Sequence, residues 1–193
     1  MLAAVILTAG ESRRMGSPKA LLPYQGRPFL EHLIEVTRHE KISVQRVVLG
    51  AGAEEISRAL RLDPETIVLN PHWEQGQLTS VQAGLRSLPE GTDGMLLALV
   101  DHPLISAALI GELIERFYSS EKAIVLPTFK GQRGHPVIFS SKLYAELLDA
   151  PVDKGARAVV WAHEHDLVEV STGEEGVVLN LNDPETMKKV MRA

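Results

Sequence analysis

Residues 6–19 read Ile-Leu-Thr-Ala-Gly-Glu-Ser-Arg-Arg-Met-Gly-Ser-Pro-Lys, so an apolar run leads directly into a glycine-rich loop. The apolar run, which starts at Leu2, predicts a buried strand. Gly10 and Gly16 allow a ligand to approach the backbone closely. The loop also carries basic side chains, at Arg13, Arg14 and Lys19. A basic glycine loop after a strand is typical of phosphate binding, and we expect it to hold a nucleoside triphosphate.

The spacing of this loop differs from that of better-known phosphate loops. A Walker loop has four residues between its glycines and then Lys followed by Ser or Thr. Here five residues separate Gly10 from Gly16, and Lys19 comes after Ser17 and Pro18. No Gly-x-Gly-x-x-Gly is present, so dinucleotide binding lacks its usual mark. The alternative is a surface turn with solvated arginines, which the density of glycine and charge disfavours.

Strand-like and helix-like segments alternate along the chain. The pattern predicts strands over 3–8, 46–50, 66–69, 95–100 and 123–126, with helices over 29–39, 53–61, 79–88 and 106–118. This alternation predicts an α/β fold with a mainly parallel central sheet flanked by helices. From residue 128 the pattern is mixed, with a short strand over 136–139 and helices over 142–148 and 156–163.

We expect a single domain over residues 1–193, with a nucleotide-binding half over about 1–105 and an acceptor-side half over about 106–193. The apolar fraction of 45% is enough for a substantial core. A net charge of −5 and a pI of about 5.8 disfavour a nucleic-acid-binding surface.

The chain has no cysteine, which excludes disulfides, thiolate metal sites and a cysteine nucleophile. No run is apolar and long enough to predict a membrane span. The apolar run up to Leu7 lacks the basic leader of a signal peptide, and we expect a cytoplasmic protein.

The loop resembles the first motif of the MobA/MocA-like nucleotidyltransferase superfamily, Leu-Ala-Ala-Gly-x-Ser-x-Arg-Met-Gly-x-x-Lys, with Thr8 where that family usually has Ala. The resemblance continues in the family's order through Ala20-Leu21-Leu22-Pro23, Gly26-x-Pro28, Leu30-Glu31, Asn70-x-x-Trp73-x-x-Gly76-x-x-x-Ser80, Asp101-His102-Pro103, Gly131-x-x-Gly134-His135-Pro136-Val137 and Asn180-Leu181-Asn182-Asp183-Pro184-Glu185. It implies a Rossmann-like, three-layer nucleotidyltransferase fold and a Mg²⁺-dependent enzyme.

The resemblance and the loop chemistry together predict the residues of the nucleotide site. Catalytic roles fall on Arg13, Lys19 and Asp101. The predicted nucleotide-binding residues are Leu7, Thr8, Ala9, Gly10, Ser12, Arg13, Gly16, Lys19, Asn70, Gly76 and Ser80. Within this set, Gly76 and Ser80 are expected to lie at the base, and the neighbouring Trp73 is expected to pack the loop.

Asp101 follows the apolar run Met-Leu-Leu-Ala-Leu-Val, where a buried strand emerges. An unpaired carboxylate is costly there, and magnesium bound to substrate phosphates would relieve the cost. The structural alternative for Asp101 is a helix cap or turn before Pro103. Asn180 and Asn182 are the other predicted metal ligands, with capping of a last helix by Asn182 and Asp183 as the alternative.

Basic residues near 131–135 predict a site for an anionic acceptor. The acceptor-binding residues are expected to be Arg133, Gly134 and His135. His163 and His165 invite a metal-site interpretation, but they lie two residues apart without a third ligand in view, and a solvated helix end is the better interpretation.

The resemblance implies transfer of a nucleoside monophosphate from CTP or GTP to a phosphorylated acceptor such as molybdopterin, with a molybdoenzyme or chaperone as a further partner. The cytidylyl branch is favoured by Asp101-His102-Pro103, whereas Asn180 and Asn182 point toward the guanylyl branch. Transfer to another small phosphorylated metabolite is a further alternative. A non-catalytic nucleotide-binding regulatory domain is disfavoured by the intact Arg13, Lys19 and Asp101.

Overall fold

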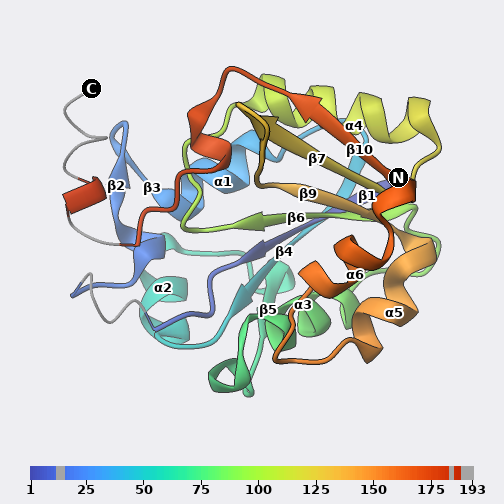
Figure 1. Ribbon diagram of the computed structural model, residues 1–193. Coiled ribbons are helices and arrows are strands. Elements are labelled where there is room, and N and C mark those ends of the chain that lie inside the picture. The colour runs from blue at the N-terminus through green and yellow to red at the C-terminus, as the bar shows by residue number, and fades with distance from the viewer. Residues whose placement is uncertain (12–15, 183–184, 188–193) are drawn as a thin grey trace.

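A single large sheet forms the centre of the molecule in the computed structural model, which describes residues 1–11, 16–182 and 185–187. The sheet has eight strands in the order β10-β7-β9-β6-β1-β4-β5, with β8 paired to β7 (Figure 1). The strands are β1 Leu2–Leu7, β4 Ile42–Leu49, β5 Ile67–Leu69, β6 Gly94–Leu99, β7 Ile124–Phe129, β8 Gln132–Arg133, β9 Val137–Ser140 and β10 Leu167–Ser171. The strands β2 Pro23–Tyr24 and β3 Arg27–Pro28 form a separate hairpin.

Most neighbouring strands of the sheet run parallel. β1 lies between β4 and β6 and is parallel to both, β5 is parallel to β4, and β10 is parallel to β7. Among the seven strands in this order, the exception is β9, which is antiparallel to β6 and to β7. The predicted mainly parallel α/β sheet is therefore confirmed, and β9 joins its two parts into one hydrogen-bonded surface.

Helices cover both faces of the sheet, which gives three layers (Figure 1). The helices are α1 Phe29–Val36, α2 Ala53–Leu60, α3 Gln77–Arg86, α4 Ala107–Ser120, α5 Tyr144–Asp149 and α6 Arg157–Ala162. Leu2, Ala4 and Ile6 of β1 pack with α1 and α4, whereas Val5 and Leu7 pack with α3, α5 and α6. Alternate side chains of β1 thus fill two cores, which is why the whole strand is apolar.

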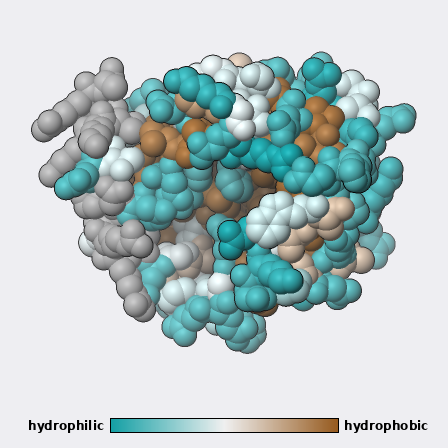
Figure 2. All heavy atoms as spheres, viewed as in Figure 1, coloured by the Kyte–Doolittle hydropathy of each residue, from teal (hydrophilic) through white to brown (hydrophobic). Residues whose placement is uncertain are grey.

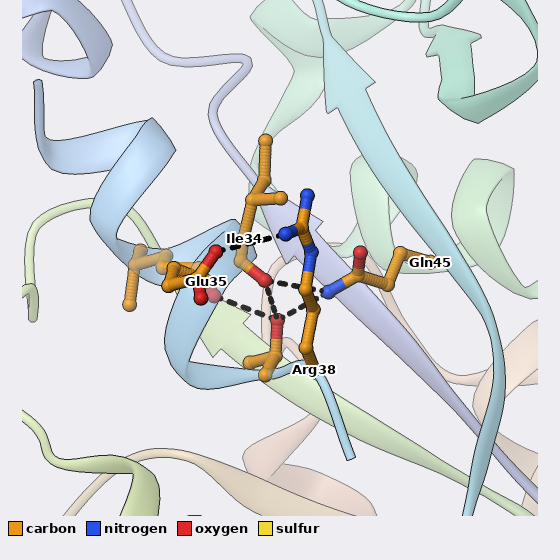
Figure 3. A network of polar contacts seen from close by, with 6 residues as sticks. Ile34, Glu35, Arg38 and Gln45 are labelled. Carbon is orange, nitrogen blue, oxygen red and sulfur yellow. Dashed lines mark hydrogen bonds and ion pairs between the residues drawn. The ribbon is translucent and has the colours of Figure 1, made fainter. Parts of the chain in front are cut away.

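Polar contacts fix the end of α1 to β4 (Figure 3). The Gln45 amide donates to the carbonyl of Ile34 and to the hydroxyl of Thr37, at 2.8 Å each. Arg38 pairs with Glu35 at 2.9 Å on the exposed side of the same turn. The buried Thr37 therefore has its hydroxyl satisfied where the helix stops.

Several features of the fold were not predicted from the sequence, among them the hairpin of β2 and β3 and the short strand β8. β4 begins at Ile42, earlier than the expected start at residue 46. β10 lies in the stretch whose pattern is mixed. It forms an edge of the sheet, and only one of its five residues is fully buried, so its hydrophobic alternation is weak. Within the described residues, no helix is both long and apolar enough to cross a bilayer.

Candidate functional site

Three segments that follow parallel strands meet at the carboxyl edge of the sheet. They are the loop after β1, the segment from β5 to α3, and the turn after β6. They enclose a cavity of ≈ 170 Å³, called the first cavity here, which is lined by Leu7, Thr8, Ala9, Gly10, Lys19, Trp73, Gln77, Ser80, Leu99, Val100 and Asp101. Ligands of open α/β sheets bind at this edge.

Lys19 and Asp101 face each other at the first cavity. The Lys19 ammonium lies 3.4 Å from Oδ2 of Asp101, and the two side chains are only 16% and 17% exposed. Oδ1 of Asp101 is buried and has no hydrogen-bond partner among the described residues. A buried carboxylate oxygen without a partner costs free energy, and a cation or a proton donor at this point would remove that cost.

The segment after β10 returns to this carboxylate. The amide of Leu181 donates to the Asp101 carbonyl at 2.8 Å, and this contact brings Asn182 to Lys19, whose ammonium donates to the Asn182 amide oxygen. Asn180 is exposed. The structure thus brings Asn182, but not Asn180, into contact with the Lys19–Asp101 pair, while Asp183 and Pro184 lie outside the described residues.

Of the remaining residues in the loop after β1 that were predicted to bind the nucleotide, some lie outside the described residues and one, Gly16, is described. Ser12 and Arg13, together with Arg14, lie outside the described residues, so their predicted roles stay predictions. Gly16 is exposed and has a φ of 68°, a left-handed conformation that favours glycine.

Asn70 organises the segment between β5 and α3 from the inside. It is 3% exposed, and its side-chain amide donates to the hydroxyls of Thr79 and Ser80 at 2.9 Å each. Its amide oxygen accepts from the His72 backbone at 2.9 Å. Asn70 therefore fixes Ser80 at the wall of the first cavity, and its own polar atoms bind within the protein.

Trp73 and Gly76 lie in the same segment. A Cβ at Gly50 would come within 2.6 Å of the Trp73 ring, so the glycine lets the ring pack closely onto the end of β4 while it also lines the first cavity. Gly76 has a φ of 125°, and a Cβ there would meet Val152 at 3.5 Å. Gly76 does not contribute to the described lining of the first cavity, although it was predicted to lie at the base.

A larger second cavity of ≈ 590 Å³ lies beside the first one, and Gln77 lines both. Its wall includes the predicted acceptor-binding residues Arg133, Gly134 and His135. Figure 2 shows a hollow over the middle of the sheet, next to α6 in the view of Figure 1, with hydrophobic residues in its floor. Gln77 therefore stands where the two cavities adjoin.

Arg133 reaches the second cavity with its charge already balanced. Its guanidinium makes two hydrogen bonds to Glu164, at 2.7 and 2.8 Å, and one to Glu169 at 2.7 Å. The hydrogen bonds to Glu164 and Glu169 raise the pKa of Arg133, and the hydrogen bond from Arg133 in turn lowers the pKa of Glu164. In this structure Arg133 fastens β8 to β10, and its predicted contact with an anionic acceptor would compete with these bonds.

Gly134 and His135 hold the segment that returns to Asp101. A Cβ at Gly134 would lie 2.3 Å from the Val177 carbonyl, and the His135 amide donates to that same carbonyl at 2.8 Å. The His135 ring lies 5.2 Å from the ring of His102, which follows Asp101 directly. Burial lowers the pKa of His135 to about 4, with a smaller contribution from His102, and burial also lowers the pKa of His102.

The histidines near α6 do not form a metal site in the part of the chain that is described. His163 pairs with Glu146 at 2.6 Å, and the described residues contain no cluster of His, Asp and Glu side chains that could hold a metal ion. At Asp101 a smaller donor set suffices, because Mg²⁺ takes one or two carboxylates and fills its shell with phosphate oxygens and water. Oδ1 of Asp101, which accepts no hydrogen bond from any residue that the structure describes, fits that requirement.

Sequence reasoning overlooked Gln77 and the contacts of His102. Gln77 stands at the first turn of α3, where it lines both cavities. Its position directly after Gly76 in the predicted base-contacting loop is the only sequence signal that could have marked it.

The parallel sheet, the loop after β1 and the carboxylate after β6 define an enzyme of the nucleotidyltransferase class. A family model for the MobA-like NTP transferase domain matches residues 4–167. The chain belongs to this family, and the resemblance stated from its sequence is confirmed.

Several known proteins are similar to this chain over most of its length. Nicotine blue oxidoreductase of Paenarthrobacter nicotinovorans is 32% identical over 187 residues, which cover 89% of each chain. Molybdenum cofactor cytidylyltransferase of Escherichia coli (strain K12) is 26% identical over 182 residues, 94% of this chain and 91% of the relative. Bifunctional protein GlmU of Rhodopseudomonas palustris (strain BisB5) is 36% identical over 128 residues, but only 28% of its length is matched.

Solved structures share the whole fold. The crystal structure of Rv0371c from Mycobacterium tuberculosis H37Rv matches with a TM-score of 0.87 and 26% identity, over 100% of this chain and 97% of that one. A further structure of Rv0371c is a complex with manganese, at a TM-score of 0.83 and 24% identity over 100% of this chain and 98% of that one.

Proposed function

We propose that this enzyme is a Mg²⁺-dependent cytidylyltransferase that transfers CMP from CTP to a phosphorylated small molecule, with a molybdopterin phosphate as the favoured acceptor. The observation that carries the proposal is the position of Asp101 at the rim of the first cavity. Its Oδ2 faces Lys19, and its buried Oδ1 has no hydrogen-bond partner in the part of the chain that the structure describes. A cytoplasmic location and the division into a nucleotide-binding half, about 1–105, and an acceptor half, about 106–193, belong to the same proposal.

In this reaction an oxygen of the acceptor phosphate attacks the α-phosphorus of CTP, and the bond to the β-phosphate breaks, so that pyrophosphate leaves. Asp101, with Asn182 beside it, would hold Mg²⁺. When bound, the ion neutralises charge on the reacting phosphates. Lys19 can donate to a phosphate oxygen from its place beside Asp101, and the Gly10 backbone lies open at the loop.

The acceptor would enter from the second cavity. Gln77 stands between the two cavities and can contact both reactants. Because the cavities adjoin, the acceptor phosphate can approach the α-phosphate without crossing bulk solvent, which is the main contribution that positioning makes to phosphoryl chemistry.

A pyrophosphate-release assay with CTP, GTP, ATP and UTP, each with molybdopterin and with other phosphorylated acceptors, tests the proposal. We expect release with CTP and molybdopterin that depends on Mg²⁺ and is lost in Asp101→Asn. Asp149→Asn, which changes an exposed carboxylate on α5, is the matched control. Release with GTP in place of CTP would contradict the base choice, and no release with any pair would contradict the reaction.

An oxidoreductase is the second candidate, favoured by the 32% identity to nicotine blue oxidoreductase over 89% of both chains. Such an enzyme needs an electron donor, and a nicotinamide dinucleotide is a common one. Calorimetry with NADPH and with CTP in the presence of Mg²⁺ separates the two candidates. Binding of CTP that requires Asp101 supports the transferase, whereas tight binding of NADPH that is unaffected by Asp101→Asn supports the oxidoreductase.

A further inference from the structure

We propose that Trp161 recognises a planar, anionic heteroaromatic group in the second cavity and thereby selects the acceptor. This inference rests on the proposed function, because it names the acceptor class of the same site. It assigns that choice to a residue on α6, which lies outside the family motifs of the sequence.

Trp161 presents much of its aromatic surface to solvent. Its side chain lines the second cavity although it is 59% exposed. The guanidinium carbon of Arg157 lies 5.7 Å from the centre of the ring. Arg157 is itself held by a hydrogen bond of 3.0 Å from its Nε to the Lys154 carbonyl. The ring is therefore supported by a cation and remains open to the cavity.

The floor of the second cavity is apolar. Its buried members are Leu78, Val81, Leu97, Leu126, Val137 and Phe139. A sugar or polyol acceptor would place hydroxyl groups against this floor, where they would lose hydrogen bonds to water. A planar ring can instead lie between the floor and Trp161, because aromatic faces stack and carry few groups that need hydrogen bonds.

The charges at the rim suit a ring that carries an anionic group. Lys154 and Arg157 line the cavity beside Trp161, whereas the charge of Arg133 is balanced by Glu164 and Glu169. The opposing charge is Asp153, which also lines the cavity and can accept a hydrogen bond from a ring N–H. The lining thus offers cations for the anionic group and a carboxylate for the ring edge.

Calorimetry on the full chain tests this inference with two anionic probes, pterin-6-carboxylate, which is planar, and glucose 1-phosphate, which is not. We expect the wild type to bind pterin-6-carboxylate more tightly than glucose 1-phosphate. Trp161→Ala should weaken that binding about tenfold, on the scale of stacking on an aromatic side chain, and Trp161→Phe should restore most of it. Leu69→Ala, which removes another exposed apolar side chain, is the control.

Equal affinity of the wild type for the two probes overturns the inference, and so does unchanged pterin-6-carboxylate binding in Trp161→Ala. A failure of this inference can be distinguished from a failure of the proposed function. If pyrophosphate release depends on Asp101 while the affinity for pterin-6-carboxylate is the same in Trp161→Ala and the wild type, the inference is wrong and the proposed function is supported. If no acceptor supports pyrophosphate release while binding of pterin-6-carboxylate requires Trp161, the proposed function is wrong and the recognition of planar anions is supported.

Discussion

The Lys19 ammonium lies 3.4 Å from one oxygen of the Asp101 carboxylate, and the other oxygen of that carboxylate is buried without a hydrogen-bond partner among the described residues. The two residues are 82 positions apart and follow different strands, β1 and β6. Their meeting joins a cation suited to phosphate with a carboxylate suited to a metal ion. The first expectations for mutagenesis come from this pair.

Asp101→Asn should lower turnover by about two orders of magnitude or more, because an amide is a weaker ligand for Mg²⁺ than a carboxylate. The fold should remain, since the amide has the same shape. Initial rates of pyrophosphate release across a magnesium titration measure the effect, with Asp149→Asn beside it. Full activity of Asp101→Asn at limiting magnesium would show that the carboxylate does not hold the metal.

Lys19→Ala should weaken binding of CTP by about 1–3 kcal/mol, the scale of a charge-assisted hydrogen bond to phosphate. Calorimetry with CTP and Mg²⁺ gives this number directly. Lys142→Ala removes a cation on an exposed turn and serves as the control. If Lys19→Ala binds CTP as the wild type does, Lys19 does not contact the phosphates of the nucleotide.

Ser80→Ala should weaken CTP binding by about 1 kcal/mol, the net value of one hydrogen bond. The Ser80 oxygen accepts from Asn70, so its hydroxyl hydrogen can be donated to a nucleotide at the first cavity, which Ser80 lines. We expect CTP to bind at least about tenfold more tightly than GTP, because the cavity is small and suits a pyrimidine. Competition binding with the two nucleotides checks both values, and tighter binding of GTP would favour guanylyl transfer.

Gly134→Ala should lower the free energy of unfolding by about 1–3 kcal/mol, because the added methyl group would lie 2.3 Å from the Val177 carbonyl. Gly173→Ala is the matched control, since a Cβ there meets nothing within 4 Å, and it should change stability by no more than about 0.5 kcal/mol. Urea unfolding of both variants measures the difference. Equal stability would mean that Val177 can move aside at no cost.

The stability of the protein should fall as the pH drops from about 6.5 to about 4. The pKa of His135 is lowered from 6.5 to about 4 in the folded state, so in this window the unfolded chain binds a proton that the folded chain does not. The loss amounts to about 3 kcal/mol across the window, and above pH 6.5 this contribution is fully present. His102, whose pKa is also lowered, acts in the same direction.

Urea unfolding at several pH values between 7 and 4 measures this slope. His135→Gln should flatten it, whereas His165→Gln, at an exposed position, should leave it unchanged. An identical slope in His135→Gln and the wild type would assign the pH dependence to other groups.

The fold could be predicted largely because its strands are buried on both faces. Leu2–Leu7 and Gly94–Leu99 are continuous apolar runs, and each is followed by a polar or glycine-rich turn, so their place in a parallel sheet follows from local pattern. β10 was not predicted because it lies at the edge of the sheet, where its apolar and polar residues alternate only weakly. Its pairing with β7 depends on contacts that no local pattern records.

For the candidate site, the sequence predicts which residues take part more readily than which side chains contact one another. Lys19 and Asp101 both belong to sequence motifs. The contact of Asn182 with Lys19, in contrast, depends on the backbone hydrogen bond from Leu181 to Asp101, two residues that are far apart in the sequence. The glutamates that balance Arg133 come from a turn and a strand about 30 residues later. Neither arrangement follows from spacing, because both depend on where the last strand lies.

The position of β1 has a consequence for how the chain reaches this structure. β1 lies in the middle of the sheet between β4 and β6, and every one of its residues is buried. During synthesis residues 2–7 leave the ribosome long before residues 94–99 exist, so one edge of an apolar strand stays open while most of the first half of the sheet is made. That interval favours aggregation, and a chaperone that covers β1 until β6 arrives should raise the yield of folded protein.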